Sequence, residues 1–381
     1  RIFQTPLLEG SLIQGDIEVN AINGTPLQFT ARGRLAGREL WVPLKDESAV
    51  VEFFFLEADP NAVNIRSAKL RWRNSHLSLM GKLLAEAKAL RFDMDVSADR
   101  VVWEEISEII GDENHPGTNQ RNPGIRLPPL VGTVRLKADN FTIAGFTVNP
   151  LQATASLSPN GIKGEIQRGD VCGITTVGKV DFTNEELGFD MSLSAKDGQL
   201  ESTSLCLTEN SYPVTGSYSL KAHIAGRGAI EKVAQTLRGQ FEFNARDGQI
   251  APSPNTDTTP LEATFDFLNR TGDFDVAFPD LDRESFPFRS ISIRGYVEGL
   301  ALVKDEFIIQ SSLATITGNG KIDLEHQQID ARGLVSVQIP GAGIVRRIPI
   351  FGSILDPSSL LGIPVRVTGP LEQPTVSYLS P

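Results

Sequence analysis

The stretch ATITGNGKIDLEHQQIDARGLVSVQIP, residues 314–340, alternates between apolar and polar residues almost throughout. Small and apolar residues occupy the even positions from Ala314 to Leu324, and after a polar turn they occupy the odd positions from Ile329 to Ile339. Successive side chains of a β-strand point to opposite faces of the sheet, so this period of two predicts a hairpin with one apolar and one polar face. An apolar face of this kind must be covered by something.

The same alternation recurs along most of the chain. Apolar residues stand at every second position near residues 13–21, 27–35, 90–96, 134–138, 189–195, 218–224, 241–245 and 291–297. The connections between these segments are mostly short and polar, which suits antiparallel hairpins and not crossovers. The pattern predicts a mainly β protein of about 20 to 25 strands, mostly antiparallel.

Only three segments have a helical pattern. Residues 99–111 begin with Asp99 as an N-cap and end in Gly111, and residues 228–239 place Ile230, Val233 and Leu237 on one stripe that should pack against the sheet. Residues 346–362 are apolar but interrupted by proline and glycine, which indicates a short helix or a loop.

Two irregularities stand out in the strand pattern. Residues 50–58 are apolar on both faces, so another element must cover that strand, and the helix at 99–111 is a candidate. Near residues 311–316 the apolar positions switch from odd to even, which indicates a bulge or a strand break.

The polar, Pro- and Gly-rich stretch at 111–130 predicts a loop or linker between two β regions. We therefore expect a first β-groove segment at 1–110, ending in a short helix, and a second β region at 131–381. A shorter loop is predicted at 251–260.

Charge and hydropathy exclude two classes of protein. The 381 residues carry 36 basic and 47 acidic side chains, a net charge of −11, with no long basic run, which argues against nucleic-acid binding. No apolar stretch reaches the roughly 18 residues of a membrane-spanning helix. Since the chain opens at Arg1 without a signal-peptide pattern, we expect a fragment or a processed product whose anchor lies elsewhere.

Cys172 and Cys206 are the only cysteines, and their spacing fits neither a zinc site nor a redox motif. They are either two buried thiols or a disulfide. In an exported protein we favour the disulfide, which would close a loop of about 34 residues, and we expect it if the two cysteines lie on neighbouring strands.

Residues that could carry out chemistry are scattered. The four histidines (His76, His115, His223 and His326) form no metal-binding motif, and GNGK at 318–321 lies inside a strand pattern instead of before a helix. A pair of glycosidase carboxylates could hide among the many acidic residues, but alternation with apolar residues explains these as the polar face of strands. We therefore expect no catalytic residue, no metal and no cofactor.

The apolar face is the informative feature. A many-stranded sheet with one apolar face must close into a barrel, pair with a second sheet or bind something apolar. Simple hairpin steps favour the last, a long curled antiparallel sheet that forms an apolar groove. The residues expected to line this groove are Phe241, Phe243, Ile291, Ile293, Ile316, Ile322, Leu324, Ile329, Val335 and Val337.

Four segments resemble the AsmA-like family. LRGQFEFNARDGQI (237–250), GNGKIDLEHQQIDARGLV (318–335) and the ending at 346–381 are similar to the C-terminal periplasmic region of that family, and residues 90–110 are similar to its strand-then-helix element. The resemblance is most specific over residues 213–381, and it marks strands and turns without catalytic residues. Residues 131–381 are thereby expected to be the family's C-terminal β-groove region.

The resemblance implies a function and a place in the cell. AsmA-like proteins are periplasmic, anchored in the inner membrane of Gram-negative bacteria, and associated with phospholipid transport to the outer membrane. This chain would then be a segment of a bridge that shields phospholipid acyl chains, with the anchor outside it. Two alternatives remain: an assembly scaffold or chaperone for outer-membrane β-barrel proteins, and an enzyme acting on envelope glycans.

Overall fold

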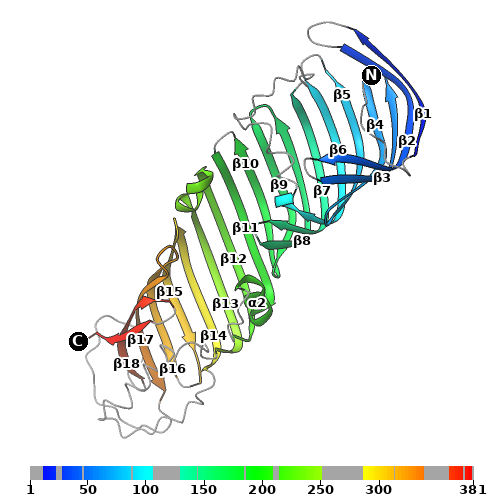
Figure 1. Cartoon of the computed structure of the whole chain (residues 1–381). Coiled ribbons are helices and arrows are strands. Elements are labelled where there is room, and N and C mark those ends of the chain that lie inside the picture. The colour runs from blue at the N-terminus through cyan, green and yellow to red at the C-terminus, as the bar shows by residue number, and fades with distance from the viewer. Residues whose placement is uncertain are drawn as a thin grey trace. The chain divides into compact units, whose positions relative to one another are not determined.

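A computed structural model describes residues 12–22, 28–44, 47–86, 89–105, 129–143, 145–183, 186–208, 214–250, 286–312, 314–338, 360–371 and 374–379. These residues form one long sheet of 19 strands that is not closed into a barrel, with a few short helices (Figure 1). The predicted fold class, a mainly β protein built on a long, mostly antiparallel sheet, is confirmed. The loop at 251–260 and residues 346–359 lie outside the described residues.

The chain divides into two compact units, of which unit 1 is Arg1–Val171 with Thr175–Leu187. Its strands are β1 (Leu12–Ile22), β2 (Gln28–Leu44), β3 (Glu47–Asp59), β4 (Ala62–Trp72), β5 (Ser75–Ala85), β6 (Leu90–Val102), β7 (Leu130–Ile143), β8 (Phe146–Ser158), β9 (Gly161–Val171) and β10 (Ile174–Thr183). Neighbours in sequence are neighbours in the sheet, and β10 pairs with β9.

Unit 2 is Cys172–Ile174 with Gly188–Pro381. Its elements are β11 (Glu186–Gln199), α2 (Leu200–Thr208), β12 (Ser217–Ala229), the 3-10 helix η2 (Ile230–Thr236), β13 (Arg238–Ile250), β14 (Phe286–Glu298), β15 (Ala301–Gln310), β16 (Ala314–Asp323), β17 (Gln328–Gln338), β18 (Leu360–Pro370) and β19 (Thr375–Tyr378). From β12 to β19, each strand pairs antiparallel with the next.

The hairpin predicted at 314–340 is present as β16 and β17. Ile316 lies opposite Val335, and Ile322 lies opposite Ile329. Asp323 closes the turn, because its Oδ1 accepts hydrogen bonds from the backbone N–H groups of Glu325 and His326 at 3.1 and 3.0 Å. The hydrogen bonds from His326 lower the pKa of the Asp323 carboxyl. The turn thus fixes a register in which one face of both strands is apolar.

One pair of strands departs from the predicted hairpins, because β6 and β7 are parallel. Parallel neighbours need a long connection, and residues 103–129 provide it, although 106–128 lie outside the described residues. The prediction of an N-cap at Asp99 is wrong. Asp99 belongs to β6 and the helix begins at Trp103, because the strand pattern continues through the buried Val101. The predicted linker at 111–130 stays a prediction, although β6 and β7 on either side of it pair within unit 1.

Strand β3 carries the segment that is apolar on both faces. Phe54 and Ala58 are buried, and Phe53 and Phe55 on the other face are half-buried. The helix expected to cover them lies largely outside the described residues, so its covering role stays a prediction.

The phase switch near 311–316 marks a strand break. Ser311 turns the chain between β15 and β16, where its backbone N–H donates to the Ala314 carbonyl at 2.9 Å and its Oγ accepts from the Ala314 N–H at 3.0 Å. A bulge does occur in this region, but within β15 between Lys304 and Phe307.

The helix expected at 228–239 is the seven-residue 3-10 helix η2, and it is shorter because β12 runs to Ala229 and β13 starts at Arg238. Val233 and Leu237 are half-buried, and the side chain of Ile230 lies outside the described residues.

We expect Val233→Asp to lower the melting temperature, because the substitution places a charge at a half-buried position and costs about 1–2 kcal/mol. The matched control is Gln235→Asp, which adds the same charge at an exposed position of the same helix. Differential scanning calorimetry measures both variants. Equal melting temperatures for the two would show that Val233 contributes nothing to packing.

The two cysteines form the favoured disulfide, with their Cα atoms 5.6 Å apart. Cys172 lies in the turn after β9, and Cys206 lies on α2, a helix that the sequence patterns did not predict. The bridge therefore forms although the two cysteines do not lie on neighbouring strands, which was the condition under which we expected it. Thr203 on α2 strengthens the attachment, since its buried hydroxyl lies 3.0 Å from both the Cys172 carbonyl oxygen and the Tyr218 hydroxyl.

Candidate functional site

The cross-strand register of unit 1 arranges its apolar residues in unbroken rows. A row here is the set of residues that lie directly opposite one another on successive strands. One row runs from β1 to β9 through Ile13, Gly37, Phe54, Ala68, Leu79, Val96, Leu136, Ala153 and Ile166. A second runs through Ile17, Gly33, Ala58, Val63, Leu83, Phe92, Gly132, Leu157 and Ile162. Between them lie Gly15, Leu35, Leu56, Ile65, Gly81, Met94, Val134, Ala155 and Gly164.

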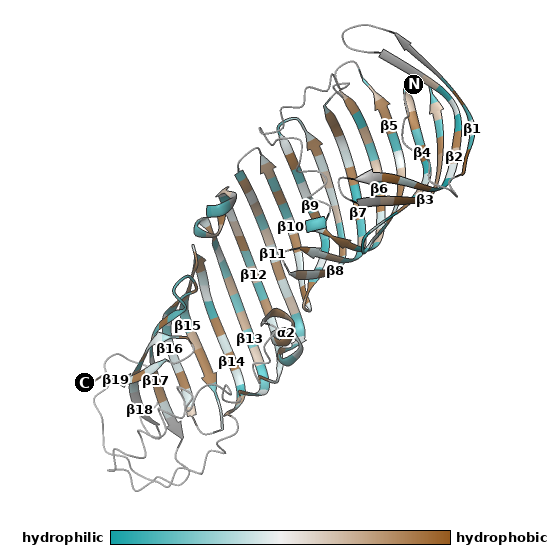
Figure 2. Ribbon diagram, viewed as in Figure 1, coloured by the Kyte–Doolittle hydropathy of each residue, from teal (hydrophilic) through white to brown (hydrophobic). Residues whose placement is uncertain are grey.

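These three rows contain no polar side chain, so one face of unit 1 is apolar across nine strands. Figure 2 shows the corresponding alternation of apolar and polar residues along the strands. Phe54, Ala58 and Phe92 are buried, whereas most other members are only half-buried and Ile13 on β1 is 42% exposed. Such a contiguous, partly exposed apolar surface is typical of a binding face.

Glycines let aromatic rings lie on this surface. A Cβ atom at Gly37 would lie 2.3 Å from a ring carbon of Phe54, so only glycine leaves room for that ring. In unit 2 the same arrangement recurs, because a Cβ at Gly318 would lie 2.7 Å from Phe307 Cζ. The rings fill the space beside the glycine backbone and keep the face apolar where side chains are missing.

Unit 2 has four such rows. Row 1 contains Tyr218, Ala245, Ile291, Ile309, Ile316 and Val335. Row 2 contains Leu220, Phe243, Ile293, Phe307, Gly318, Gly333 and Val365. Row 3 contains Ala222, Phe241, Gly295, Lys304, Gly320, Ala331 and Val367. Row 4 contains Ile224, Gly239, Val297, Leu302, Ile322, Ile329 and Gly369.

Row 1 is the most buried of the four rows, and no member of row 4 is fully buried. Val335 in row 1 is 2% exposed, Ile322 in row 4 is half-buried, and Leu324 beyond it is 46% exposed. Row 1 thus forms the centre of a hydrophobic cluster that also includes Phe286 and Phe288. The apolar face of unit 2 has a dry side and a side that water reaches.

Eight of the ten residues predicted to line a groove are members of these rows on one face. Ile291, Ile316 and Val335 are buried, and Phe241, Phe243, Ile293, Ile322 and Ile329 are half-buried. Leu324 lies outside the rows, because the turn at Asp323 begins just before it. Val337 lies opposite Ala314 in the ladder, but its side chain is outside the described residues.

The sequence patterns missed one member of the face, Lys304. The bulge between Lys304 and Phe307 moves the apolar face from even positions (Leu302) to odd positions (Ile309), so Lys304 shares the face with Leu302. The adjacent polar residues Asp305 and Glu306, which break the alternation within β15, are the signal that could have revealed it.

The opposite face is charged and exposed. Arg135 donates from Nε to Asp95 at 2.6 Å, and Arg366 donates two hydrogen bonds to the carboxylate of Asp330 at 3.0 and 2.9 Å. These hydrogen bonds lower the pKa of the Asp95 and Asp330 carboxyls. Because the pairs are exposed, they contribute little to stability. These charged side chains favour contact of this face with water.

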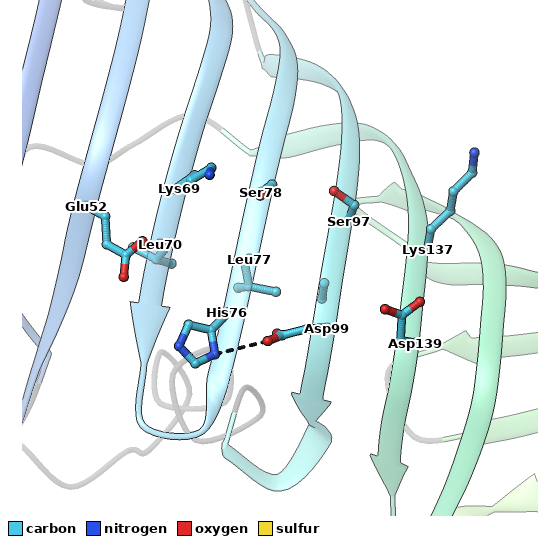
Figure 3. Close-up of a pocket in the computed structure, with 11 residues that line it drawn as sticks. Glu52, Lys69, Leu70, His76, Leu77, Ser78, Ser97, Asp99, Lys137 and Asp139 are labelled. Carbon is cyan, nitrogen blue, oxygen red and sulfur yellow. Dashed lines mark ion pairs between the residues drawn. The ribbon is translucent and has the colours of Figure 1, made fainter.

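A polar pocket of about 460 Å³ also lies in unit 1, on strands β3 to β7 (Figure 3). His76 Nδ1 lies 3.4 Å from Asp99 Oδ2, and the two side chains are 50% and 62% exposed. This is the geometry of a surface ion pair when the imidazole is protonated. The other lining residues are Glu52, Lys69, Leu70, Leu77, Ser78, Ser97, Ala98, Lys137 and Asp139.

Within the described ranges, no cluster of histidine, cysteine and acidic residues could hold a metal ion. None of the helices described there has the length and apolarity needed to cross a membrane. No protein-family model, curated protein or solved structure matches this chain. Inferences about function therefore depend on the two faces of the sheet.

Proposed function

We propose that this chain is a segment of a periplasmic, bridge-like lipid-transfer protein, in which the apolar face forms a groove that shields phospholipid acyl chains between the inner and outer membranes. The observation that carries the proposal is the set of apolar rows in each unit, which are unbroken in unit 1 and contain one charged residue, Lys304, in unit 2. The proposed activity is shielding and transfer, without a chemical reaction.

The energy of an acyl chain in water explains why such a face is needed. Exposing about 15 methylenes costs roughly 12 kcal/mol at about 0.8 kcal/mol each. With strands about 4.8 Å apart, a row across the nine strands β1 to β9 spans on the order of 40 Å. A half-exposed apolar surface of that extent offsets most of the cost, while the headgroup stays in solvent.

Two further observations support the cellular setting. The segments at 237–250 and 318–335, which resemble AsmA-like proteins, form β13 and the β16–β17 hairpin at the centre of unit 2. The disulfide between Cys172 and Cys206 is typical of an oxidising compartment. We accordingly propose membership of the AsmA-like family, a periplasmic location and an inner-membrane anchor outside this chain.

Native mass spectrometry of the purified chain tests the proposal. We expect peaks heavier than the protein by the mass of one or more phospholipids, because lipid held on the apolar rows is retained during gentle purification. Organic extraction should remove this mass, and incubation with phospholipid vesicles should restore it. A protein that carries no lipid and takes none up from the vesicles would refute the proposed function.

A second candidate function is a scaffold that accepts a strand of an outer-membrane β-barrel protein. The observation that favours it concerns β1, which within the described part of the chain has a strand register with β2 alone, while Ile13 and Ile17 are 42% and 38% exposed. An open strand edge next to apolar side chains can bind a partner strand through backbone hydrogen bonds. A photo-crosslinker at Ile13 that captures an unfolded barrel protein, in a chain that binds no lipid, would favour the scaffold.

A further inference from the structure

Lys304 is the one charged residue in rows 1 to 4 of unit 2. Within row 3 it lies between two glycines, Gly295 on β14 and Gly320 on β16. Along its own strand, Leu302 and Phe307 are its neighbours on the same face. None of these four neighbours has an oxygen atom in its side chain, so the side chains next to Lys304 on this face offer the ammonium no hydrogen-bond acceptor.

Among the described residues of this face, Lys304 has no counterion. No ion pair or side-chain hydrogen bond of Lys304 occurs among the residues that the structure describes, and the adjacent acidic residues Asp305 and Glu306 are exposed in the bulge. Burial lowers the pKa of the Lys304 ammonium below its usual value. A half-buried cation without a partner reduces stability, so a structural role does not explain it.

The position of Lys304 matches the polarity of an amphiphile. Rows 2 and 4, on either side of row 3, contain mostly half-buried apolar side chains, whereas row 1 is largely buried. A lipid whose chains lie on the half-buried side chains of rows 2 and 4 would bring its phosphate within reach of Lys304 in row 3. An ammonium group in partly apolar surroundings binds a phosphate oxygen more strongly than one in water.

We infer that Lys304 binds the phosphate of a glycerophospholipid whose acyl chains lie on the half-buried apolar side chains of rows 2 and 4 of unit 2, on either side of it. This inference rests on the proposed lipid-binding function and adds to it a defined position for the headgroup. The alternative is that the lysine stem covers apolar surface while the ammonium reaches water, without contacting a ligand.

The test compares two fluorescent probes that share the same acyl chains, a phosphatidylglycerol and a diacylglycerol that lacks the phosphate. Lys304→Met keeps the length of the stem and removes the charge. The matched control is Lys321→Met on β16, which removes the same charge from an exposed position on the polar face. Lys304→Arg retains the charge.

We expect Lys304→Met to weaken binding of the phosphatidylglycerol probe about ten-fold or more, as expected for the loss of a charged hydrogen bond. Diacylglycerol binding should not change, and the melting temperature should stay equal or rise, because an unpaired charge has been removed. Lys321→Met should bind both probes like the wild type, and Lys304→Arg should retain most of the phosphatidylglycerol affinity.

Other results would overturn the inference. If Lys304→Met weakens the binding of both probes equally, the residue contributes to packing. If it weakens the binding of neither probe, the ammonium contacts water and no ligand. In both cases the proposed function stands. A wild-type chain that binds neither probe would refute the proposed function, and this inference with it.

Discussion

Val335→Asp is expected to unfold much of unit 2, lowering the free energy of unfolding by more than about 3 kcal/mol, because a carboxylate in this position has neither water nor a partner. Val335 is 2% exposed, lies opposite Ile316 and belongs to the main hydrophobic cluster of the unit. Guanidinium unfolding followed by circular dichroism measures the loss.

An aspartate introduced in row 4, at Ile322, should have a different effect. Ile322 is half-buried on the side of the face that water reaches, so Ile322→Asp should leave the sheet folded while it places a charge on the apolar path. We expect an unfolding midpoint close to that of the wild type and a loss of bound phospholipid. Asn319→Asp, which adds an equal charge on the exposed polar side of the same strand, is the control for both properties.

The pair of variants distinguishes an open face from a closed core. If Ile322→Asp unfolds the chain as severely as Val335→Asp, the whole face is a closed core. If Ile322→Asp folds and still retains lipid, the lipid does not lie on row 4.

The second large effect is expected at the disulfide. Replacing both Cys172 and Cys206 with serine should cost about 3–4 kcal/mol, the chain-entropy value for a loop closed by residues about 34 apart. The loss should be concentrated at α2, because a nine-residue helix is marginal by itself and is attached here by the disulfide and by Thr203.

Hydrogen exchange measured by mass spectrometry resolves where the stability is lost. We expect peptides from α2 to exchange much faster in the double variant, while peptides from β16 and β17 remain protected. Thr203→Val is the companion variant, because it removes the hydroxyl contacts with Cys172 and Tyr218 but leaves the disulfide. Unchanged exchange at α2 in the double variant would show that the helix is held by packing alone, for example through Leu200.

Local patterns in the sequence predicted the local parts of the fold. The hairpin at 314–340 follows from a period of two on either side of a polar turn, and both are properties of adjacent residues. The helix start at Asp99 failed because Asp99 also fits the polar side of the strand pattern, and pairing of β6 with β7 extends the strand to Val102. Pairing with a distant strand competes with local capping, and a single sequence does not show it.

The candidate site was predictable in composition but not in arrangement. Alternation identified the apolar side chains of individual strands, such as Ile291 and Ile316, but the rows depend on register, which is set between strands. Lys304 shows the difference, because only the bulge in β15 brings it onto the face shared with Phe307. The sequence also did not show that row 1 is more buried than row 4, because the burial of a side chain depends on which residues of other strands pack against it.

The parallel pair β6–β7 changes which rim of unit 1 carries the turn after each strand. In a sheet of hairpins each step reverses the chain, so the turns that follow odd-numbered strands share one rim and those that follow even-numbered strands share the other. Because β7 repeats the direction of β6, this rule is inverted from β7 onward: the β7–β8 turn lies on the rim of the β2–β3 and β4–β5 turns. A hairpin inserted anywhere else adds two strands and preserves the rims, whereas a gain or loss of the connection at 103–129 exchanges them. Any feature that depends on which rim faces a membrane or a partner would thus be inverted by a change in that one connection.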